Sequence, residues 1–184
     1  MYVLLDRDGV INERVMGGYV TSWEQFAFLP GALEGLRRLT QCGYIPIVVS
    51  NQAGVGKGLL SRETLDEITR RLLAQVEAAG GRLGGVYYCP HRDEDGCACR
   101  KPKPGLLFEA QKDHGFDFTE TFLVGDSRSD LLAAQAVGCP AILVAAGAAP
   151  SLEGVATPPR AVVRDLAEAA EYIISSLTQG PYCR

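Results

Sequence analysis

Two aspartates follow the first apolar stretch of the chain, and their type and spacing suit the binding of a cation. Asp6 and Asp8 come directly after the run Tyr2–Leu5. Residues two apart on an extended backbone point to the same side. Two carboxylates held that close repel each other unless a cation lies between them. The pair therefore indicates a cation site, and a solvated turn is the alternative for this motif taken alone.

Groups that can hold an anion follow the next apolar run. Ser50, Asn51 and Gln52 end that run, and Gly54 and Gly56 come shortly after them. Hydroxyl, amide and freed backbone N–H groups in such a turn can hold an anion. A simple polar turn is the alternative.

Two later segments add a cation and more carboxylates. Arg100 and Lys101 stand in a loop stiffened by two prolines, which suggests that a positive charge is aimed rather than left on the surface. Asp126 follows the apolar run 122–124, and Asp130 stands four residues later, where an acid also favours the start of a helix.

A cluster of soft ligands precedes the basic loop. Cys89, His91, Cys97 and Cys99 form the pattern C-x-H-x5-C-x-C. Three thiolates and an imidazole fit Zn²⁺ in a closed tetrahedral site of structural type. The alternative is three buried thiols beside a solvated histidine. The remaining cysteines, interpreted as inert thiols without partners, are Cys42, Cys139 and Cys183.

Apolar β-branched runs alternate with helical periodicities along the chain, so these groups have defined elements to carry them. The expected strands are residues 2–5, 45–49, 86–88, 122–124 and 141–144. The expected helices run from Pro30 to near Gly43, through 65–76 with Ser61 as the cap, from Pro104 to before Gly115, over 130–137, and through 166–177. Residues 147–159 are expected to form a surface loop.

This alternation predicts an α/β fold, a three-layer α/β/α sandwich with a central parallel sheet. Ligands of such sheets bind beyond the carboxyl ends of the strands. Neither a repeat nor an interdomain linker is evident, so one domain over residues 1–184 is expected.

The groups described above stand in chain order at four successive strand ends, and this pattern resembles the haloacid dehalogenase superfamily of aspartyl phosphatases. The resemblance spans residues 4–130. It implies a Rossmann-like sheet and the Mg²⁺-dependent hydrolysis of a phosphomonoester. The roles it implies are nucleophile for Asp6, general acid and base for Asp8, Mg²⁺ ligation by Asp6, the Asp8 carbonyl and Asp126, stabilisation of the phosphoryl group by Ser50 and Lys101, and support by Asp130.

The cysteine cluster directly before Arg100 narrows the resemblance to the subgroup of heptose bisphosphate phosphatases and histidinol-phosphate phosphatases. The segments Gly18–Val20, Ser50–Gly54 and Arg100–Gly105 favour the heptose type, which acts in heptose precursor biosynthesis on the 7-phosphate. The substrate implied is a small phosphosugar. The contacts implied for it are Gly18, Tyr19, Ser50, Asn51, Gln52, Arg100 and Lys101.

Two departures from the heptose pattern border the expected substrate. The loop of residues 89–99 is shorter than in some relatives of this type, and the segment 12–18 is slightly longer. Residues 12–29 are long enough for a flap but not for a cap domain, so a capless, open site is expected.

Composition excludes several other classes of protein. The chain has 184 residues, 47% hydrophobic and 22% charged, with a net charge of −4. Disorder is excluded, and a sequence-blind nucleic-acid binder would need a basic surface. No apolar run is long enough for a membrane helix, and no signal peptide is evident. The cytoplasm is therefore the expected compartment. A monomer is also expected.

Two alternatives remain open at this point. One is a related phosphatase acting on histidinol phosphate or on a polynucleotide 3′-phosphate, although the negative charge disfavours a nucleic-acid substrate. The other is a binding module that keeps the zinc cluster beside a decayed phosphatase site. Competent residues at all four strand ends argue against the second alternative.

Overall fold

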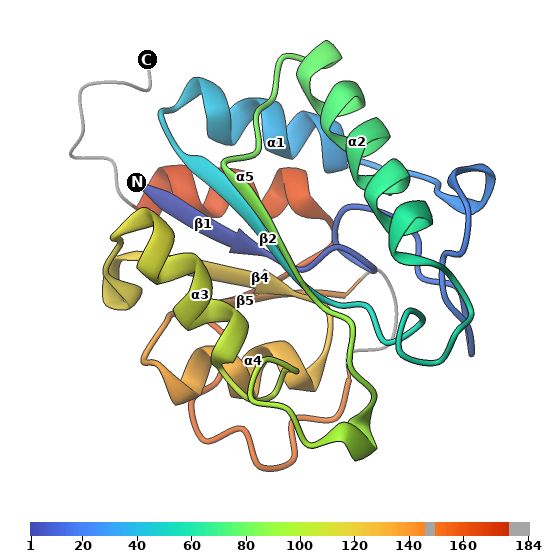
Figure 1. Ribbon diagram of the computed structural model, residues 1–184. Coiled ribbons are helices and arrows are strands. Elements are labelled where there is room, and N and C mark those ends of the chain that lie inside the picture. Colours follow the sequence, from blue (N-terminus) through green and yellow to red (C-terminus); the bar gives the residue numbers. More distant parts are fainter. Residues whose placement is uncertain (146–149, 177–184) are drawn as a thin grey trace.

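A computed structural model describes residues 1–145 and 150–176, and within them the strands form one parallel sheet (Figure 1). The sheet order is β3–β2–β1–β4–β5–β6. The strand bounds are β1 Tyr2–Leu5, β2 Ile45–Asn51, β3 Gly85–Cys89, β4 Phe122–Gly125, β5 Ala141–Val144 and β6 Ala161–Val163. The chain moves outward from β1 to β3 and then restarts at β4, so the strand order reverses between β1 and β4, where ligands of such sheets bind.

Helices cover both faces of the sheet. Their bounds are α1 Ala32–Gln41, α2 Arg62–Ala78, α3 Gly105–His114, α4 Arg128–Ala136 and α5 Leu166–Ser176, with short 3₁₀ turns η1 Trp23–Gln25, η2 Asp93–Asp95 and η3 Phe118–Glu120. Figure 1 shows α1, α2 and α5 on one side of the sheet and α3 and α4 on the other. Each side has its own cluster of buried apolar residues. The predicted α/β/α sandwich is confirmed.

The central strand shows how the sheet positions the first aspartate. Val3 and Leu5 point into the cluster under α1, α2 and α5, whereas Leu4 points into the cluster under α3 and α4. Both faces are covered, so the strand is apolar throughout. Asp6 follows directly, and its backbone N–H donates to the Val124 carbonyl oxygen at 2.9 Å. The ladder thus fixes Asp6 at the carboxyl end of the sheet's central pair.

Most expected elements are present, with small shifts at their ends. Ser61 caps α2, and its hydroxyl accepts a hydrogen bond from the Thr64 backbone N–H at 3.1 Å. β2 continues two residues beyond the expected end at Val49, so Ser50 and Asn51 belong to the strand. Pro30 precedes its helix instead of forming the first turn, since Gly31 in a left-handed conformation is the cap of α1.

The sequence did not predict β6. This strand has three residues, and Val162 in its middle is 59% exposed, so it carries no buried apolar pattern. Residues 150–160 form no helix or strand, which fits the loop expected there. Leu177 and residues 147–149 lie outside the described part of the chain.

The flap, residues 12–29, is closed at its base by backbone hydrogen bonds. The Glu13 N–H donates to the Ala27 carbonyl at 2.8 Å. Phe26 is buried, and the ring of Trp23 stacks on it at a centroid distance of 4.9 Å. The guanidinium of Arg71 on α2 lies 5.9 Å from the Trp23 ring. Aromatic packing therefore fixes one side of the flap to the helical layer.

The cysteines outside the metal-ligand pattern differ from one another. Cys42 is disulfide-bonded, so its interpretation as an inert thiol is wrong, because isolated positions along a sequence do not reveal which cysteines the fold brings together. Cys139 is a buried thiol whose Sγ donates to the Thr121 carbonyl oxygen at 2.7 Å. Cys183 lies outside the described residues.

Among the described helices, none is long and apolar enough to cross a membrane.

Candidate active site

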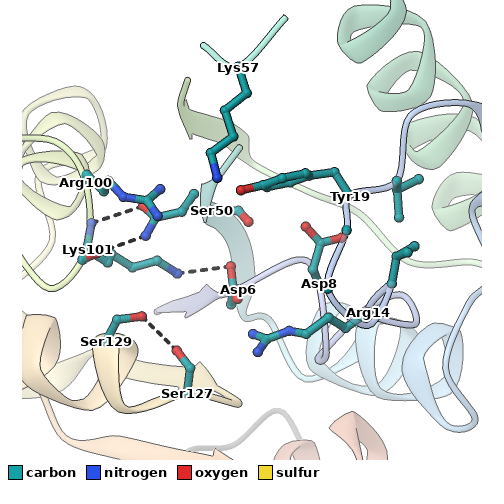
Figure 2. A pocket seen from close by; sticks show the side chains of 15 residues that line it. Asp6, Asp8, Arg14, Tyr19, Ser50, Lys57, Arg100, Lys101, Ser127 and Ser129 are labelled. Carbon is teal, nitrogen blue, oxygen red and sulfur yellow. Dashed lines mark hydrogen bonds and ion pairs between the residues drawn. The ribbon is translucent and has the colours of Figure 1, made fainter. Parts of the chain in front are cut away.

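A cavity of about 420 Å³ opens at the carboxyl ends of the strands (Figure 2). Most of the predicted site residues line it. The lining residues are Asp6, Asp8, Arg14, Val15, Gly17, Gly18, Tyr19, Val20, Ser50, Asn51, Lys57, Arg100, Lys101, Ser127 and Ser129. Parallel strands end on the same edge, and this brings together motifs that lie far apart in the sequence.

Lys101 links two carboxylates at the floor of the cavity. Its Nζ lies 3.0 Å from Asp6 Oδ1 and 2.5 Å from Asp130 Oδ1, and it donates to the Val49 carbonyl oxygen at 2.7 Å. The lysine is 3% exposed. Burial alone would lower the pKa of Lys101, but Asp130 and Asp6 outweigh it and raise this pKa. The ammonium group therefore stays charged beside Asp6.

Asn51 holds the basic loop against β2. Its Nδ2 donates to the Lys101 carbonyl oxygen at 2.9 Å, and its Oδ1 accepts from the Lys101 N–H at 3.0 Å. This paired contact fixes the backbone from which the Lys101 side chain extends. Asn51 thus acts on the cavity through the lysine loop as well as through its place in the wall.

Asp6, Asp126 and Asp130 form a carboxylate group whose ligand atoms lie within 4.8 Å of one another. Burial raises the pKa of Asp6, and Lys101 only partly offsets this. Burial and the charge of Asp6 raise the pKa of Asp126 to about 7. Although Lys101 is close, Asp6 Oδ1 accepts no well-directed hydrogen bond from the described residues. A divalent cation, which prefers oxygen ligands, fits this group. Its charge would offset the raised pKa values of Asp6 and Asp126, and it would give Asp6 Oδ1 a partner.

Two glycines allow the close approach of these carboxylates. Gly9 has φ +91°, and a Cβ there would stand 1.9 Å from Asp126 Oδ2. A Cβ on Gly125 would stand 2.3 Å from the Asp130 Cβ. Any side chain at either place would displace a carboxylate. The glycine of the Asp6–Gly9 motif is thus needed for both its backbone conformation and its lack of volume.

Asp130 has two partners besides its place in the carboxylate group. Its Oδ2 accepts hydrogen bonds from the Ser127 N–H at 3.1 Å and from the Ser127 hydroxyl at 2.5 Å, which caps α4. Its Oδ1 faces Lys101. The residue is fully buried. Asp130 therefore starts its helix and orients the lysine at the same time.

Arg14 is a cavity residue that the sequence analysis missed. It extends from the flap, and its Nη2 lies 2.7 Å from Asp126 Oδ1. In Figure 2 its guanidinium lies beside Asp6, on the side of Ser127. A lone arginine in a loop is usually surface charge, so nothing in the sequence distinguished it.

The opposite wall of the cavity gathers cations around Tyr19. Lys57 Nζ lies 5.3 Å from the centre of the Tyr19 ring. Arg100 donates from Nε to Asp93 Oδ1 at 2.5 Å. Figure 2 shows Lys57, Arg100 and the Tyr19 hydroxyl converging above Ser50. Lys57 was also missed, although its place between two glycines after β2 is a signal that could have found it.

Gln52 differs from its expected place. It was expected to contact substrate, but it is 1% exposed and is absent from the cavity wall. Its side chain faces Asp8 and Ser50 inside the protein. The remaining predicted contacts, Gly18, Tyr19, Ser50, Asn51, Arg100 and Lys101, all line the cavity.

The four soft ligands converge on one point beside the basic loop. Cys99 Sγ lies 3.2 Å from both Cys89 Sγ and His91 Nδ1, and 3.4 Å from Cys97 Sγ. All four ligand atoms lie within 4.8 Å of one another. Such spacing matches the edges of a tetrahedron around one ion. The cluster could therefore hold a metal next to Arg100.

Comparison with known proteins places this site in a family. A family model described as HAD-hydrolase-like matches residues 98–169. The D-glycero-beta-D-manno-heptose-1,7-bisphosphate 7-phosphatase of Pseudomonas aeruginosa is 40% identical over 79% of this chain and 81% of its own. The D-glycero-alpha-D-manno-heptose-1,7-bisphosphate 7-phosphatase of Mycobacterium bovis is 41% identical over 82% of this chain and 77% of its own.

A solved structure is similar across nearly the whole chain. The crystal structure of D,D-heptose 1,7-bisphosphate phosphatase from B. bronchiseptica, complexed with magnesium and phosphate, has a TM-score of 0.84 and 35% identity. The match covers 95% of this chain and 98% of that one. Sequence and fold agree, and the chain belongs to the HAD-like hydrolases, in the family of the heptose bisphosphate 7-phosphatases.

Proposed function

We propose that the protein is a Mg²⁺-dependent phosphomonoesterase that removes the 7-phosphate of D-glycero-D-manno-heptose 1,7-bisphosphate. The observation that carries this proposal is the position of Asp6. It is a buried carboxylate at the end of the central strand, with Lys101 on one side and two further carboxylates within 4.8 Å. The similarity to heptose-1,7-bisphosphate 7-phosphatases supports the choice of substrate.

The carboxylate group suits one hard divalent cation. Asp6, Asp126 and the backbone carbonyl of Asp8 would hold Mg²⁺, which prefers oxygen ligands. When bound, the ion neutralises charge between the nucleophile and the phosphoryl group. The crystal structure from B. bronchiseptica contains magnesium, in line with this assignment.

The proposed reaction has two steps. A carboxylate oxygen of Asp6 attacks phosphorus, and the bond from phosphorus to the ester oxygen breaks while Asp8 gives its proton to the leaving alkoxide. Asp8, now a carboxylate, then takes a proton from a water that attacks the phosphorus of the aspartyl phosphate. The Asp6–phosphate bond breaks, and inorganic phosphate and free Asp6 result.

The remaining polar groups of the floor stabilise the transferring phosphoryl group in this scheme. Ser50 and Lys101 border Asp6, so their hydroxyl and ammonium groups would donate to the equatorial oxygens. Asp130 acts through Lys101, which it holds at 2.5 Å. Because Asp130 already holds Lys101 in place, the lysine need not move when negative charge develops on the phosphoryl group.

The cations on the far wall suit the second anionic group of a bisphosphate. Lys57 and Arg100 stand beside Tyr19, and an arginine fork matches phosphate geometry. Gly18 and Tyr19 bring the flap, residues 12–29, to the same part of the cavity. We therefore propose a capless, single-domain phosphatase whose substrate is gripped between the flap and the loop of residues 89–99.

The cysteine cluster is proposed to bind structural zinc. Four protein ligands, Cys89, His91, Cys97 and Cys99, leave no open position for water, unlike a catalytic zinc site. Cys99 directly precedes Arg100, so the ion anchors the backbone next to the cations of the wall. A metal clip offsets the entropy of ordering this loop.

A substrate panel tests the proposed function. Phosphate release with Mg²⁺ is measured from both anomers of the heptose 1,7-bisphosphate and from histidinol phosphate. Both anomers are included because the relative named for the beta anomer and the relative named for the alpha anomer are about equally similar to this chain. We expect kcat/KM to be highest for a heptose bisphosphate. A preference for histidinol phosphate would contradict the substrate, and release from none of the panel would contradict the activity.

Two variants test the chemistry. Asp6→Asn is expected to abolish turnover, because an amide neither attacks phosphorus nor binds Mg²⁺ comparably. Asp8→Asn is expected to keep Mg²⁺ binding through its backbone carbonyl and to lose about a hundredfold or more in kcat. If Asp6→Asn kept more than about a percent of activity, the aspartyl-phosphate mechanism would be wrong.

A further inference from the structure

We infer that Arg7, Gln52 and Asn12 form a buried clamp that positions Asp8 for the transfer of its proton to the leaving group. The inference rests on the proposed function and adds three positioning residues to it. It also assigns to Gln52 a role other than substrate contact.

Arg7 is the centre of the clamp. It is fully buried although it stands between two aspartates at the end of β1. Its Nη2 donates to Asp8 Oδ1 at 3.0 Å and to Oδ2 at 3.1 Å. The guanidinium also lies 5.9 Å from the Phe26 ring centre and 5.6 Å from that of Tyr88. Aromatic rings thus hold the cation against one carboxylate.

Gln52 adds a second donor, and its orientation is dictated by Arg7. The guanidinium has only donors, so the oxygen of the Gln52 amide must face it, and Oε1 accepts from Arg7 Nη2 at 3.0 Å. The amide nitrogen must then point the other way. It donates to Asp8 Oδ2 at 2.7 Å and lies 3.2 Å from Ser50 Oγ.

Asn12 supplies the third donor from the base of the flap. Its Nδ2 donates to Asp8 Oδ1 at 2.8 Å and to the Glu13 carbonyl oxygen at 2.9 Å. The clamp therefore joins β1, the end of β2 and the flap around a single carboxylate. Asp8 remains 21% exposed on its cavity side, so it can still reach a substrate.

The clamp holds the Asp8 carboxyl group by both of its oxygens. Oδ1 is contacted by Arg7 and Asn12, and Oδ2 by Arg7 and Gln52. A general acid works only when it lies within hydrogen-bond reach of the oxygen that takes its proton. The clamp would therefore keep Asp8 in the orientation that the proton transfer needs.

The clamp predicts a dependence on the leaving group. An alkoxide leaving from a sugar phosphate needs a proton, whereas p-nitrophenolate leaves without one. Loss of a group that assists the general acid therefore lowers kcat/KM for the first substrate selectively. A variant that merely destabilised the fold or the cavity would lower kcat/KM for both substrates.

The decisive variant is Gln52→Leu, with kcat/KM measured for the heptose bisphosphate and for p-nitrophenyl phosphate. We expect a fall of about thirtyfold for the sugar phosphate, less than the loss of about a hundredfold or more on removing the general acid itself, because Gln52 only positions it. The aryl phosphate should fall by less than about threefold, because its leaving group needs no proton. KM for the sugar phosphate should change little. A rise in KM with unchanged kcat would instead make Gln52 a substrate contact and overturn the inference.

Two further variants complete the design. Arg7→Lys keeps a charge but loses the fork, so it should show the same selective loss as Gln52→Leu. The matched control is Asn51→Ala, at the neighbouring position of β2, whose side chain contacts the Lys101 backbone and not Asp8. This variant should lower kcat/KM for the sugar phosphate and for the aryl phosphate to a similar extent.

Failure of the inference and failure of the proposed function give different results. Equal losses for both substrates in Gln52→Leu, while Asp8→Asn shows the selective loss, would overturn the clamp alone. An Asp8→Asn variant without any leaving-group selectivity would overturn the acid role on which the clamp depends. No hydrolysis of either phosphate by the unaltered protein would overturn the proposed function.

Discussion

At the end of β4, Asp126 carries a charge that the metal-free fold disfavours. Its pKa is raised from 3.8 to about 7, chiefly by burial and then by Asp6. The unfolded chain releases this proton at lower pH, so the shift costs stability increasingly from about pH 4 to pH 7 and fully above it. The site thus favours metal binding at the expense of stability.

Asp126→Asn should therefore stabilise the protein in the absence of Mg²⁺. Without added Mg²⁺ at pH 8 we expect a Tm several degrees above that of the unaltered chain, a gain that shrinks at pH 5. Added Mg²⁺ should raise the Tm of the unaltered protein and not that of the variant. Thermal unfolding with and without Mg²⁺ measures both effects, and a lower Tm of the variant at pH 8 without Mg²⁺ would contradict the cost assigned to the Asp126 charge.

Arg14 is expected to compete with Mg²⁺ for Asp126. Its guanidinium lies 2.7 Å from an oxygen that the ion would use. Half-exposed ion pairs are worth about 1 kcal/mol or less, so Arg14→Met should tighten Mg²⁺ binding by up to about fivefold. Calorimetric titration of the full chain measures this. Unchanged or weaker Mg²⁺ binding would show that Arg14 does not compete.

Gly9 is expected to tolerate no side chain. Gly9→Ala would place a Cβ 1.9 Å from Asp126 Oδ2, so both Mg²⁺ binding and turnover should be lost. Gly43→Ala is the control, because its φ of +79° imposes similar backbone strain with nothing within 4 Å. That variant should lose about 1–2 kcal/mol of stability, the cost of a side chain in the left-handed region, and keep its activity. Similar kinetics for the two variants would refute the steric argument.

At the scale of elements, the loop of residues 89–99 is expected to depend on the ion proposed for it. Its Pro90 carbonyl oxygen accepts from the Gly56 N–H at 3.0 Å, and its Ala98 carbonyl oxygen accepts from the Gly105 N–H at the start of α3 at 3.0 Å. Lys103, just before α3, donates from Nζ to the Gly96 carbonyl oxygen at 2.7 Å. The ion would add a direct cross-link between residues 89–91 and residues 97–99. Arg100 is placed by the same backbone.

Cys97→Ser should consequently lower the Tm and raise KM, with a smaller effect on kcat. The purified protein should contain about one zinc per chain and the variant much less. Cys139→Ser is the matched control, since this thiol is buried outside the cluster and should leave the zinc content unchanged. A folded and fully active protein without zinc would refute the structural role.

At the scale of the whole molecule, β6 is one edge of the sheet, and its sequence opposes pairing with another copy. The strand has three residues, and Arg160 and Arg164 flank it. Short edges with charged neighbours resist edge-to-edge association. Val162 is the exposed residue of this strand, whereas Ala161 and Val163 are partly buried against the core.

The protein should therefore be a monomer of 19.7 kDa in solution. Light scattering after size-exclusion chromatography measures the mass directly. Val162→Lys should leave that mass unchanged, because a monomer makes no contact with another copy along this edge. Twice the monomer mass for the unaltered chain, restored to one copy in the variant, would show that β6 is an interface.

The sequence by itself was sufficient for the layered α/β fold and for the groups at the strand ends. Apolar runs and helical periodicities are local, and a strand covered on both faces must be apolar throughout, as β1 is. Parallel strands end on one edge, so residues such as Asp6, Ser50, Lys101 and Asp126 can be expected to meet there without knowledge of any contact. The spacing of the cysteine cluster is equally local.

Only the tertiary structure decided which polar side chains face the cavity and which face one another. Gln52 turns inward because Arg7 is buried beneath it, and no periodicity reports on a buried arginine. Arg14 and Lys57 reach the cavity from loops whose course depends on packing against other segments. The strand β6 depends on pairing with β5, because its own residues bury too little apolar surface to define it. Contacts between distant segments are set by packing of the whole chain, which local sequence patterns do not encode.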